Sequence, residues 1–457
     1  MPYILPLILL TSLFCSPLQA QSPWTSLFDG QNLDAWTIIN GTAEYTIEGE
    51  AIVGTSTMGT PNTFLRTQDT YSDFILEVEV YDDPRLNSGI QIRSNTDPAY
   101  RDGVVHGYQV EIDPSPRAYS GGIYDEQRRG WLYPLSYNPG GRKAFVNGRW
   151  NNYRIEARGA NIRVWINGVQ TADLVDNMTA EGFIGLQVHS INDPSVEGAQ
   201  VKWRNIRIAT TALDELSWSS DPDIHQVNLI ANTISETEQR KGWRLLWDGQ
   251  TTEGWRSARA ETFPSKGWSI EDGELHVEAS TGGESTNGGD IITKEKYGDF
   301  ELSFEFKLSS GANSGVKYYV DPEINQGPGS SIGLEYQILD DARHQDAKQG
   351  VAGNRTLASL YDLITARNLS VPSRGKSFRG VDQWNLGYIK SKNGHVEHWL
   401  NGDKVIEYDR YTQMFRALVA YSKYSKWDRF GELATGHILL QDHGDHVAFR
   451  SIKIREL

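Results

Sequence analysis

Two histidines and two aspartates lie close together near the C-terminal end of the chain, in the run Asp442-His443-Gly444-Asp445-His446. A neutral imidazole has suitable basicity near pH 7, so a histidine here can accept a proton from a substrate. Imidazoles and carboxylates together can also hold a divalent cation. The simpler alternative is a polar hairpin in which Asp442 or Asp445 only holds the ring of His443. The run therefore predicts acid–base chemistry, a metal site or a polar turn.

A second charged stretch begins inside a predicted strand and continues into a loop. It runs Glu335-Tyr336-Gln337-Ile338-Leu339-Asp340-Asp341 and then Arg343-His344-Gln345-Asp346. Glu335 and Asp340 supply carboxylates that can act as bases. As a metal cluster the loop is a weak candidate, because loops of mixed charge are usually just solvated.

Polar residues alternate with apolar residues along several short segments of the C-terminal half. Residues two apart on a strand point to the same face of a sheet, so each segment presents one polar stripe. The stripes are rich in Gln, Tyr, His and single charges, whereas a plain solvent face carries Lys, Glu and Thr. We therefore expect one binding face that contains Lys317, Tyr319, Glu335, Gln337, Tyr361, Gln441 and His443.

Arg450 falls on the same predicted strand face as Ile452 and Ile454. We expect it to be partly buried, where a guanidinium group needs an acceptor. An ion pair with a carboxylate is the simpler interpretation. Anchoring of a substrate carbonyl or hydroxyl is the alternative.

The chain contains one pattern twice. Leu27-Phe28-Asp29-Gly30 returns as Leu246-Trp247-Asp248-Gly249, and Asn87-Ser88-Gly89 returns as Asn313-Ser314-Gly315. We assign residues 22–210 to a first copy, 244–457 to a second copy and 211–243 to a linker. In the linker, Ser235 and Glu238 form a capping box that predicts a short helix. The polar stripes of the first copy place Gln91, Arg93, Gln109, Glu111, Tyr124, Gln187 and His189 at the matching positions.

The period within each copy is two, and long helical periodicity is absent. Asn167-Gly168 and Asn401-Gly402 mark tight hairpin turns between strands. Many short antiparallel strands in each copy predict an all-β fold, in which each copy is a two-sheet β-sandwich or jelly roll.

Composition excludes several classes of function. The formal net charge of −15 argues against nucleic acid or an anionic membrane as partner. The chain has one cysteine, Cys15, so neither a disulfide framework nor a multi-thiolate metal site is expected. The 14 Trp and 21 Tyr suit stacking on sugars, although such residues also fill β-sandwich cores.

The N-terminal residues 1–20 resemble a secretory signal peptide. An apolar run over residues 4–16 precedes Pro17-Leu18-Gln19-Ala20, and the run is too short to span a bilayer. We expect export to the periplasm or the medium. A lipid anchor on Cys15 is the alternative.

Signatures of common hydrolases are missing. The sequence has no Gly-x-Ser-x-Gly elbow, no His-Glu-x-x-His zinc motif and no phosphate-binding P-loop. The Glu-x-Asp-x-x-Glu motif of laminarinase-type sandwiches in glycoside hydrolase family 16 begins at Glu111-Ile112-Asp113 but meets Pro116 where its last carboxylate should be. Hydrolysis by a pair of carboxylates is therefore disfavoured.

Several motifs together resemble the 3-keto-disaccharide hydrolase family. They include Glu335 to Asp340, His398-Trp399-Leu400-Asn401-Gly402 and the C-terminal segment from Leu440 to Leu457. The resemblance implies a concanavalin A-like jelly roll and cleavage of glycosides oxidised to a ketone at sugar carbon 3. We count the motif residue His398 among the substrate-binding residues. The match is looser in the first copy, so we expect activity in the second.

That substrate class explains why one base can suffice. A ketone at C3 acidifies the C2 hydrogen, so its removal can expel the C1 oxygen by elimination, and water then adds to the enone. His443 is our candidate base, with Glu335 or Asp340 in reserve. Lys317, Gln441, Arg450 or a divalent cation could stabilise the enolate oxygen.

Two other functions fit the same residues. A non-catalytic, lectin-like carbohydrate-binding protein would use the same aromatic and amide side chains. A scaffolding protein without a sugar site would need neither His443 nor the polar face.

Overall fold

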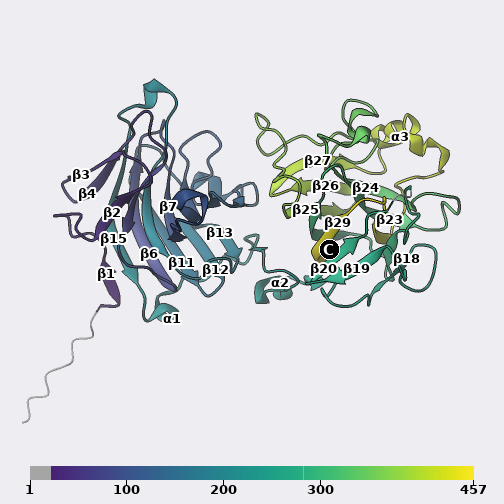
Figure 1. The fold of residues 1–457 in the computed structure, drawn as a ribbon, viewed down its shortest axis with the longest axis horizontal. Coiled ribbons are helices and arrows are strands. Elements are labelled where there is room, and N and C mark those ends of the chain that lie inside the picture. The colour runs from purple at the N-terminus through teal and green to yellow at the C-terminus, as the bar shows by residue number, and fades with distance from the viewer. Residues whose placement is uncertain (1–21, 281–282) are drawn as a thin grey trace, which may run out of the picture.

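The computed structural model describes residues 22–280 and 283–457, and the predicted signal peptide at residues 1–20 lies outside them. Strands dominate both copies, which confirms the predicted all-β class with two tandem sandwiches. Figure 1 shows the copies as two lobes, purple to blue and green to yellow, with a linker helix between them. Within the described part of the chain, no helix has the length and apolar character needed to cross a membrane.

The first copy consists of two sheets. The larger is ordered β16 (Val227–Asn228), β13 (Val169–Val175), β12 (Asn161–Ile166), β11 (Asn151–Arg158), β6 (Phe74–Asp82), β15 (Gln200–Ala209), β4 (Ala51–Thr55) and β3 (Glu44–Glu48), with β1 (Trp24–Ser26) beside β15. The smaller is ordered β10 (Gly130–Tyr133), β9 (Ile123–Glu126), β8 (His106–Ile112), β7 (Ser88–Asn95), β14 (Phe183–Val188), β5 (Thr63–Thr67) and β2 (Trp36–Ile39). The linker strand β16 pairs parallel to β13, which attaches the linker to the first copy.

The second copy repeats this plan. Its larger sheet is ordered β19 (Trp268–Glu271), β20 (Glu274–Val277), β29 (Val447–Glu456), β22 (Phe300–Leu308), β25 (Asn385–Lys392), β26 (His395–Leu400) and β27 (Asp403–Asp409), with β17 (Arg244–Leu245) beside β29. Its smaller sheet is ordered β18 (Trp255–Ser257), β21 (Ile291–Thr293), β28 (His437–Leu440), β23 (Asn313–Asp321) and β24 (Ile332–Leu339).

Helices are few and short among the described residues. They are α1 (Leu213–Leu216), α2 (Glu236–Arg240) and α3 (Gln413–Ala420), with 3₁₀ turns η1 (Arg101–Gly103), η2 (Gly141–Lys143), η3 (Pro194–Val196), η4 (Gln345–Lys348) and η5 (Lys423–Lys426). The capping box predicted at the start of α2 is present, because Ser235 and Glu238 each bond the backbone N–H of the other.

The same strand irregularities occur in both copies. Arg93 in β7 and Tyr319 in β23 have φ of 44° and 54°, and the pairing with the next strand shifts at both places. Asn205 in β15 and Ser451 in β29 also match, with φ of 52° and 50°. An extra residue in a strand moves the following side chains to the opposite face. The alternation read from the sequence therefore fails beyond each bulge.

Two predicted binding residues lie on a different strand face from the one that the alternation indicated, for this reason. Tyr319 lies in the hydrophobic core, where its hydroxyl donates to Gly298 O at 2.7 Å. Arg450 lies on the outer face of the larger sheet and pairs with Glu305 at 2.9 Å. Placing Tyr319 and Arg450 at the substrate was wrong, and for Arg450 the simpler interpretation, an ion pair, is confirmed.

His398 was also assigned wrongly, because it is a core residue of β26 with 0% of its surface exposed. Its Nδ1 lies 3.1 Å from Ala358 O, which can only accept, so Nδ1 carries the proton. Nε2 then accepts from the hydroxyl of Tyr318 at 2.7 Å, and that hydroxyl lies 2.8 Å from Tyr408 Oη. Burial lowers the pKa of His398 to about 4, so the ring stays neutral inside the fold.

The two copies touch through loops and one hairpin turn. The turn Asn401-Gly402 lies against the first copy, where the hydroxyl of Ser136 donates to Gly402 O and Tyr137 stacks on Trp399. A side chain at position 402 would come within 2.4 Å of Pro134, so glycine is required for this approach. A Cβ added at the matching Gly168 would have no atom of the described residues within 4 Å. The same hairpin turn therefore serves as an interface in the second copy alone.

The buried neutral His398 makes a prediction about stability at acidic pH. An unfolded histidine gains its proton as pH falls through about 6.5, whereas folded His398 stays neutral down to about pH 4. Its contribution to unfolding free energy therefore falls between those values by about 1.4 kcal/mol per pH unit. We expect His398→Gln to be less stable at pH 7 but to lose stability less steeply on acidification. Urea unfolding at several pH values measures this.

Tyr408→Phe is the matched control, since it removes one hydroxyl of the same network and no imidazole. It should lower stability and keep the wild-type slope. Equal slopes for wild type and His398→Gln would contradict the assignment of a neutral ring.

Candidate functional site

The polar face of the second copy is the side of its smaller sheet that is turned away from the core. Lys317 on β23 and Glu335 on β24 are directly opposite in the strand register, and Lys317 Nζ lies 3.6 Å from Glu335 Oε2. Gly315 also faces this side, and a Cβ there would meet Glu335 Oε1 at 2.5 Å. The glycine of Asn313-Ser314-Gly315 thus leaves room for the Glu335 carboxylate.

The charges of this pair are almost completely enclosed, with 5% of Lys317 and 4% of Glu335 exposed. Burial opposes the ammonium, but Glu335 and Asp290 outweigh it and raise the pKa of Lys317. Burial raises the pKa of Glu335 above its usual range, while Lys317 works against that rise. The face therefore holds a permanent cation beside a carboxyl group that is readier than usual to hold a proton.

Lys317 is fixed from a second side. Its ammonium donates to the hydroxyl of Ser330 and to Ser331 O at 3.3 Å. Ser330 in turn donates to the buried carboxylate of Asp290 at 2.5 Å. The ammonium consequently has a defined position rather than the freedom of a surface lysine.

His443 lies at the edge of the same face. Its Nε2 is 3.2 Å from Asn313 Nδ2, which can only donate, so this nitrogen carries the lone pair. The ring is half-buried and lines a cavity of about 510 Å³ together with Tyr361, Asp346, His344 and Asn313. His443 thus presents a neutral imidazole to a space that a small ligand can enter.

Amide groups of the site retain unused capacity for hydrogen bonds. Gln441 Nε2 donates to Glu284 Oε1 at 2.7 Å, but Gln441 Oε1 has no partner within the described chain. Asn313 Oδ1 is also buried and has no hydrogen-bond partner among the described residues. Buried polar atoms are normally paired, so unpaired ones at a polar face suggest that a ligand or water completes them.

The structure brings together six of the predicted site residues. Lys317, Glu335, Gln337 and Gln441 lie on one sheet face, and His443 and Tyr361 line the neighbouring cavity. Tyr361 is anchored by a hydrogen bond of 2.7 Å to Asp346. Gln337 is 1% exposed, and its Oε1 accepts from the N–H of Ile338.

Asp340 is a structural residue, so its assignment as a reserve base is wrong. Its carboxylate accepts the backbone N–H groups of Gly311 at 2.8 Å and Ala342 at 3.1 Å. It therefore fastens two turns at the end of β24. Asp442 does the same for Gly288, Gly289 and Gly444, which leaves His443 as the part of its cluster that faces the cavity.

Sequence reasoning missed the contribution of the segment between β27 and β28. This segment carries α3 and η5, and Lys423 Nζ of η5 lies 4.1 Å from the centre of the Tyr361 ring. Lys423 also acts on Glu335 electrostatically. In the first copy the corresponding connection between β13 and β14 is only residues 176–182, so the repeat gave no signal for these residues.

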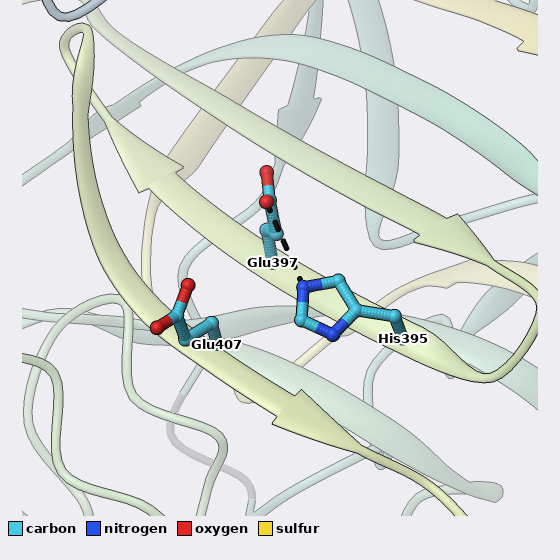
Figure 2. A group of neighbouring side chains, drawn as sticks. All are labelled: His395, Glu397 and Glu407. Atoms are coloured by element: carbon cyan, nitrogen blue, oxygen red, sulfur yellow. Dashed lines mark ion pairs between the residues drawn. The ribbon is translucent and has the colours of Figure 1, made fainter.

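One group of side chains within the described ranges has the spacing of a metal site, but the ammonium group of Lys404 already pairs with its carboxylates. Figure 2 shows His395 and Glu397 on β26 and Glu407 on β27. Lys404 Nζ lies 2.9 Å from Glu397 and 3.0 Å from Glu407, and His395 Nδ1 lies 2.8 Å from Asp409. The group is a ladder of surface ion pairs on the larger sheet, which explains its composition without a metal.

The first copy replaces the charged pair by neutral amides. Gln91 and Gln109 stand at the positions of Lys317 and Glu335, and Gln91 Nε2 donates to Gln109 Oε1 at 2.6 Å. Gln187, at the position of Gln441, donates to the same oxygen at 2.9 Å. The two copies therefore share the geometry of this face but differ in its charge.

Comparison with known proteins agrees with this duplicated plan. The family model described as the 3-keto-alpha-glucoside-1,2-lyase-like domain matches residues 23–209 and again residues 242–455. The chain belongs to this family. It is similar to a protein of Bacteroides thetaiotaomicron named 3-keto-disaccharide hydrolase, with 38% identity over 236 residues, which cover 47% of this chain and 79% of the relative.

Two solved structures are also similar to parts of the chain. One is a protein of Parabacteroides distasonis proposed to be a glycosyl hydrolase, 27% identical, covering 50% of this chain and 99% of its own, with a TM-score of 0.43. The other is the carbohydrate-binding module CBM66 from Bacillus subtilis, which is 19% identical. The match covers 38% of this chain and 96% of the module, with a TM-score of 0.28.

The buried pair Lys317 and Glu335 makes a prediction about coupling. Glu335→Gln leaves the ammonium without its nearest carboxylate, so we expect a loss of about 3 kcal/mol of unfolding free energy. Changing Lys317→Gln as well recreates the amide pair of the first copy. We expect the double variant to lose about 1 to 3 kcal/mol less than the sum of the single variants. Urea unfolding of the four proteins measures the coupling, and additive losses would contradict it.

Proposed function

We propose that the second copy cleaves the glycosidic bond of 3-keto-glycosides or 3-keto-disaccharides by elimination followed by hydration. The observation that carries this proposal is the position of one neutral imidazole, His443, at the edge of the sheet face that holds an enclosed cation, Lys317. Membership of the family and the name of the Bacteroides thetaiotaomicron relative support the substrate class.

The reaction begins with removal of the C2 hydrogen as a proton by His443, whose Nε2 lone pair gives up its hydrogen bond from Asn313 Nδ2 to accept that proton. The electron pair of the C2–H bond forms an enolate with the C3 carbonyl, and Lys317 or Gln441 Nε2 stabilises the negative oxygen. Collapse of the enolate breaks the C1–O bond, and the leaving oxygen takes a proton from the imidazolium or from Glu335, whose raised pKa suits this role. Water then adds at C1 while a proton returns to C2.

Two residues that the sequence suggested for this reaction have no part in the mechanism. Arg450 belongs to an ion pair on the outer face of the larger sheet, and Asp340 fastens turns. A divalent cation in place of Lys317 remains the alternative as Lewis acid. Lys317 is preferred because its ammonium is already fixed beside Glu335.

We also propose that the protein acts outside the cytoplasm, in the periplasm or the medium. This part rests on the signal-peptide pattern of residues 1–20 alone.

His443→Gln tests the base. The ring is half-buried and lines a cavity, so the fold should remain and the melting temperature should change little. Turnover of a 3-keto-glycoside should fall by about 10² to 10⁴, which is the usual contribution of a positioned base. Exchange of the C2 hydrogen in deuterated water, followed by NMR, should fall in parallel.

His189→Gln is the matched control, because His189 occupies the same place in the first copy. It should keep full turnover. Near-full turnover in His443→Gln with unchanged melting would place the base elsewhere, and Glu335 would be tested next.

Chelation tests the source of the electrophile. If Lys317 stabilises the enolate, EDTA should leave the turnover of a 3-keto-glycoside within about twofold of its starting value. Loss of activity on chelation, with recovery after a divalent cation is added back, would replace Lys317 by a metal ion.

A further inference from the structure

The first copy carries the larger cavity of the two polar faces. Its volume is about 930 Å³, against about 510 Å³ beside His443. The floor is formed by the smaller sheet, including Gln109 and Glu111 of β8 and Tyr124 of β9. A cavity of this size takes a ligand of several tens of atoms at most, such as a disaccharide or a short oligosaccharide.

A chain of amides fixes the orientation of Glu111 in this floor. Gln91 and Gln187 both donate to Gln109 Oε1, so the other end of Gln109 must donate, and its Nε2 lies 3.0 Å from Glu111 Oε2. Asn87 Nδ2 donates to Glu111 Oε1 at 2.8 Å. Each carboxyl oxygen of Glu111 therefore already has a donor from the protein.

Glu111 can consequently offer a proton only toward the cavity. Burial raises the pKa of Glu111 to about 7, although Arg117, Asn87 and Gln109 work against the rise. When the carboxyl group is protonated, its protein neighbours are donors, so the O–H bond must find its acceptor on a ligand or water. A sugar hydroxyl can both accept from this group and donate to it.

The wall of the cavity has an aromatic side. Trp131 and Tyr124 both line it, with ring centres 5.3 Å apart and ring planes at 73°. Arg142 also lines it, and its Nε is buried without a partner in the chain that is described. Rings beside unsatisfied polar groups are the usual composition of a sugar site.

The roof of this cavity comes from the second copy. Residues 370–374, in the connection between β24 and β25, complete the lining, and Val371 packs against the hydrophobic core of the first copy. The roof is attached to its own copy by Leu369 N–H to Lys404 O at 2.8 Å and by Lys404 N–H to Ser370 Oγ at 2.8 Å. Arg379 then bonds Trp131 O across the interface at 2.9 Å.

We propose that this cavity is a second sugar-binding site, shared between the copies and selective for an uncharged mono- or oligosaccharide. The formal charges of the lining balance, because it contains three arginines and three acidic residues: Arg117, Arg142, Arg374, Glu111, Asp113 and Glu126. A neutral polyol fits such a lining better than an anion or a cation does. The site lies outside the cleavage machinery of the second copy and retains sugar without needing a ketone.

Binding of unoxidised disaccharides to the full-length protein tests the proposal. Isothermal titration with trehalose, maltose, sucrose and cellobiose should show at least one that binds. Glu111→Gln, which removes the proton-donating carboxyl group, and Arg374→Ala, which trims the exposed roof, should each weaken that binding at least tenfold. Arg149→Ala is the matched control for the roof, because it removes an exposed arginine of the first copy that does not line the cavity.

Two results would overturn the proposal. One is no binding of any of the four disaccharides at millimolar concentration. The other is binding of equal strength in wild type, Glu111→Gln and Arg374→Ala, which would place the sugar in the second copy. Because the probes carry no ketone, a failure of 3-keto-glycoside cleavage leaves this test intact.

Discussion

One left-handed residue in the middle of a strand decides what the smaller sheet of each copy can do. Before Tyr319, β23 alternates between the core and the polar face, and Lys317 points to the polar face. At Tyr319 the strand turns both neighbouring tyrosines into the core, and Val320 takes the face that Lys317 occupied. The polar face is therefore short, and its charges are gathered around the β23–β24 pair instead of running along the strand.

The duplicated fold keeps this geometry while its chemistry differs. The same positions hold an ion pair in the second copy and a pair of amides in the first. An enclosed ion pair gains little stability over neutral groups, because desolvation of the charges offsets their attraction. Its presence in one copy alone is thus better explained by a task that needs a fixed cation than by stability. The amides suit a task that needs directional hydrogen bonds without charge.

The sequence predicted the sheet face correctly wherever strands were regular. Alternation placed Lys317, Glu335 and Gln441 together, and spacing placed His443 near them. Both can be read from the sequence, because side chains two residues apart on any regular strand share a face. It failed at Tyr319 and Arg450, where an extra residue reverses the alternation and no residue type announces it.

Sequence reasoning misplaced His398 and missed Lys423 for other reasons. A histidine in an alternating strand can serve the core when a carbonyl and a hydroxyl satisfy both ring nitrogens, as Ala358 and Tyr318 do here. Lys423 comes from a connection that has no counterpart in the first copy, and its approach to Tyr361 depends on tertiary packing. Local pattern carries no information about either contact.

Because the roof at residues 370–374 belongs to the second copy, ligand binding to the first copy depends on how the second copy is docked against it. A ligand that touches both the floor and the roof binds only when the two copies are docked. It therefore stabilises the docked arrangement by RT ln(1 + [L]/Kd). At a hundredfold excess over Kd this amounts to about 2.7 kcal/mol. Changes in the linker, far from any sugar, would then alter the affinity of the first copy. The ligand would then add a further contact between the copies to the linker, the turn at Gly402 and the hydrogen bond from Arg379 to Trp131 O.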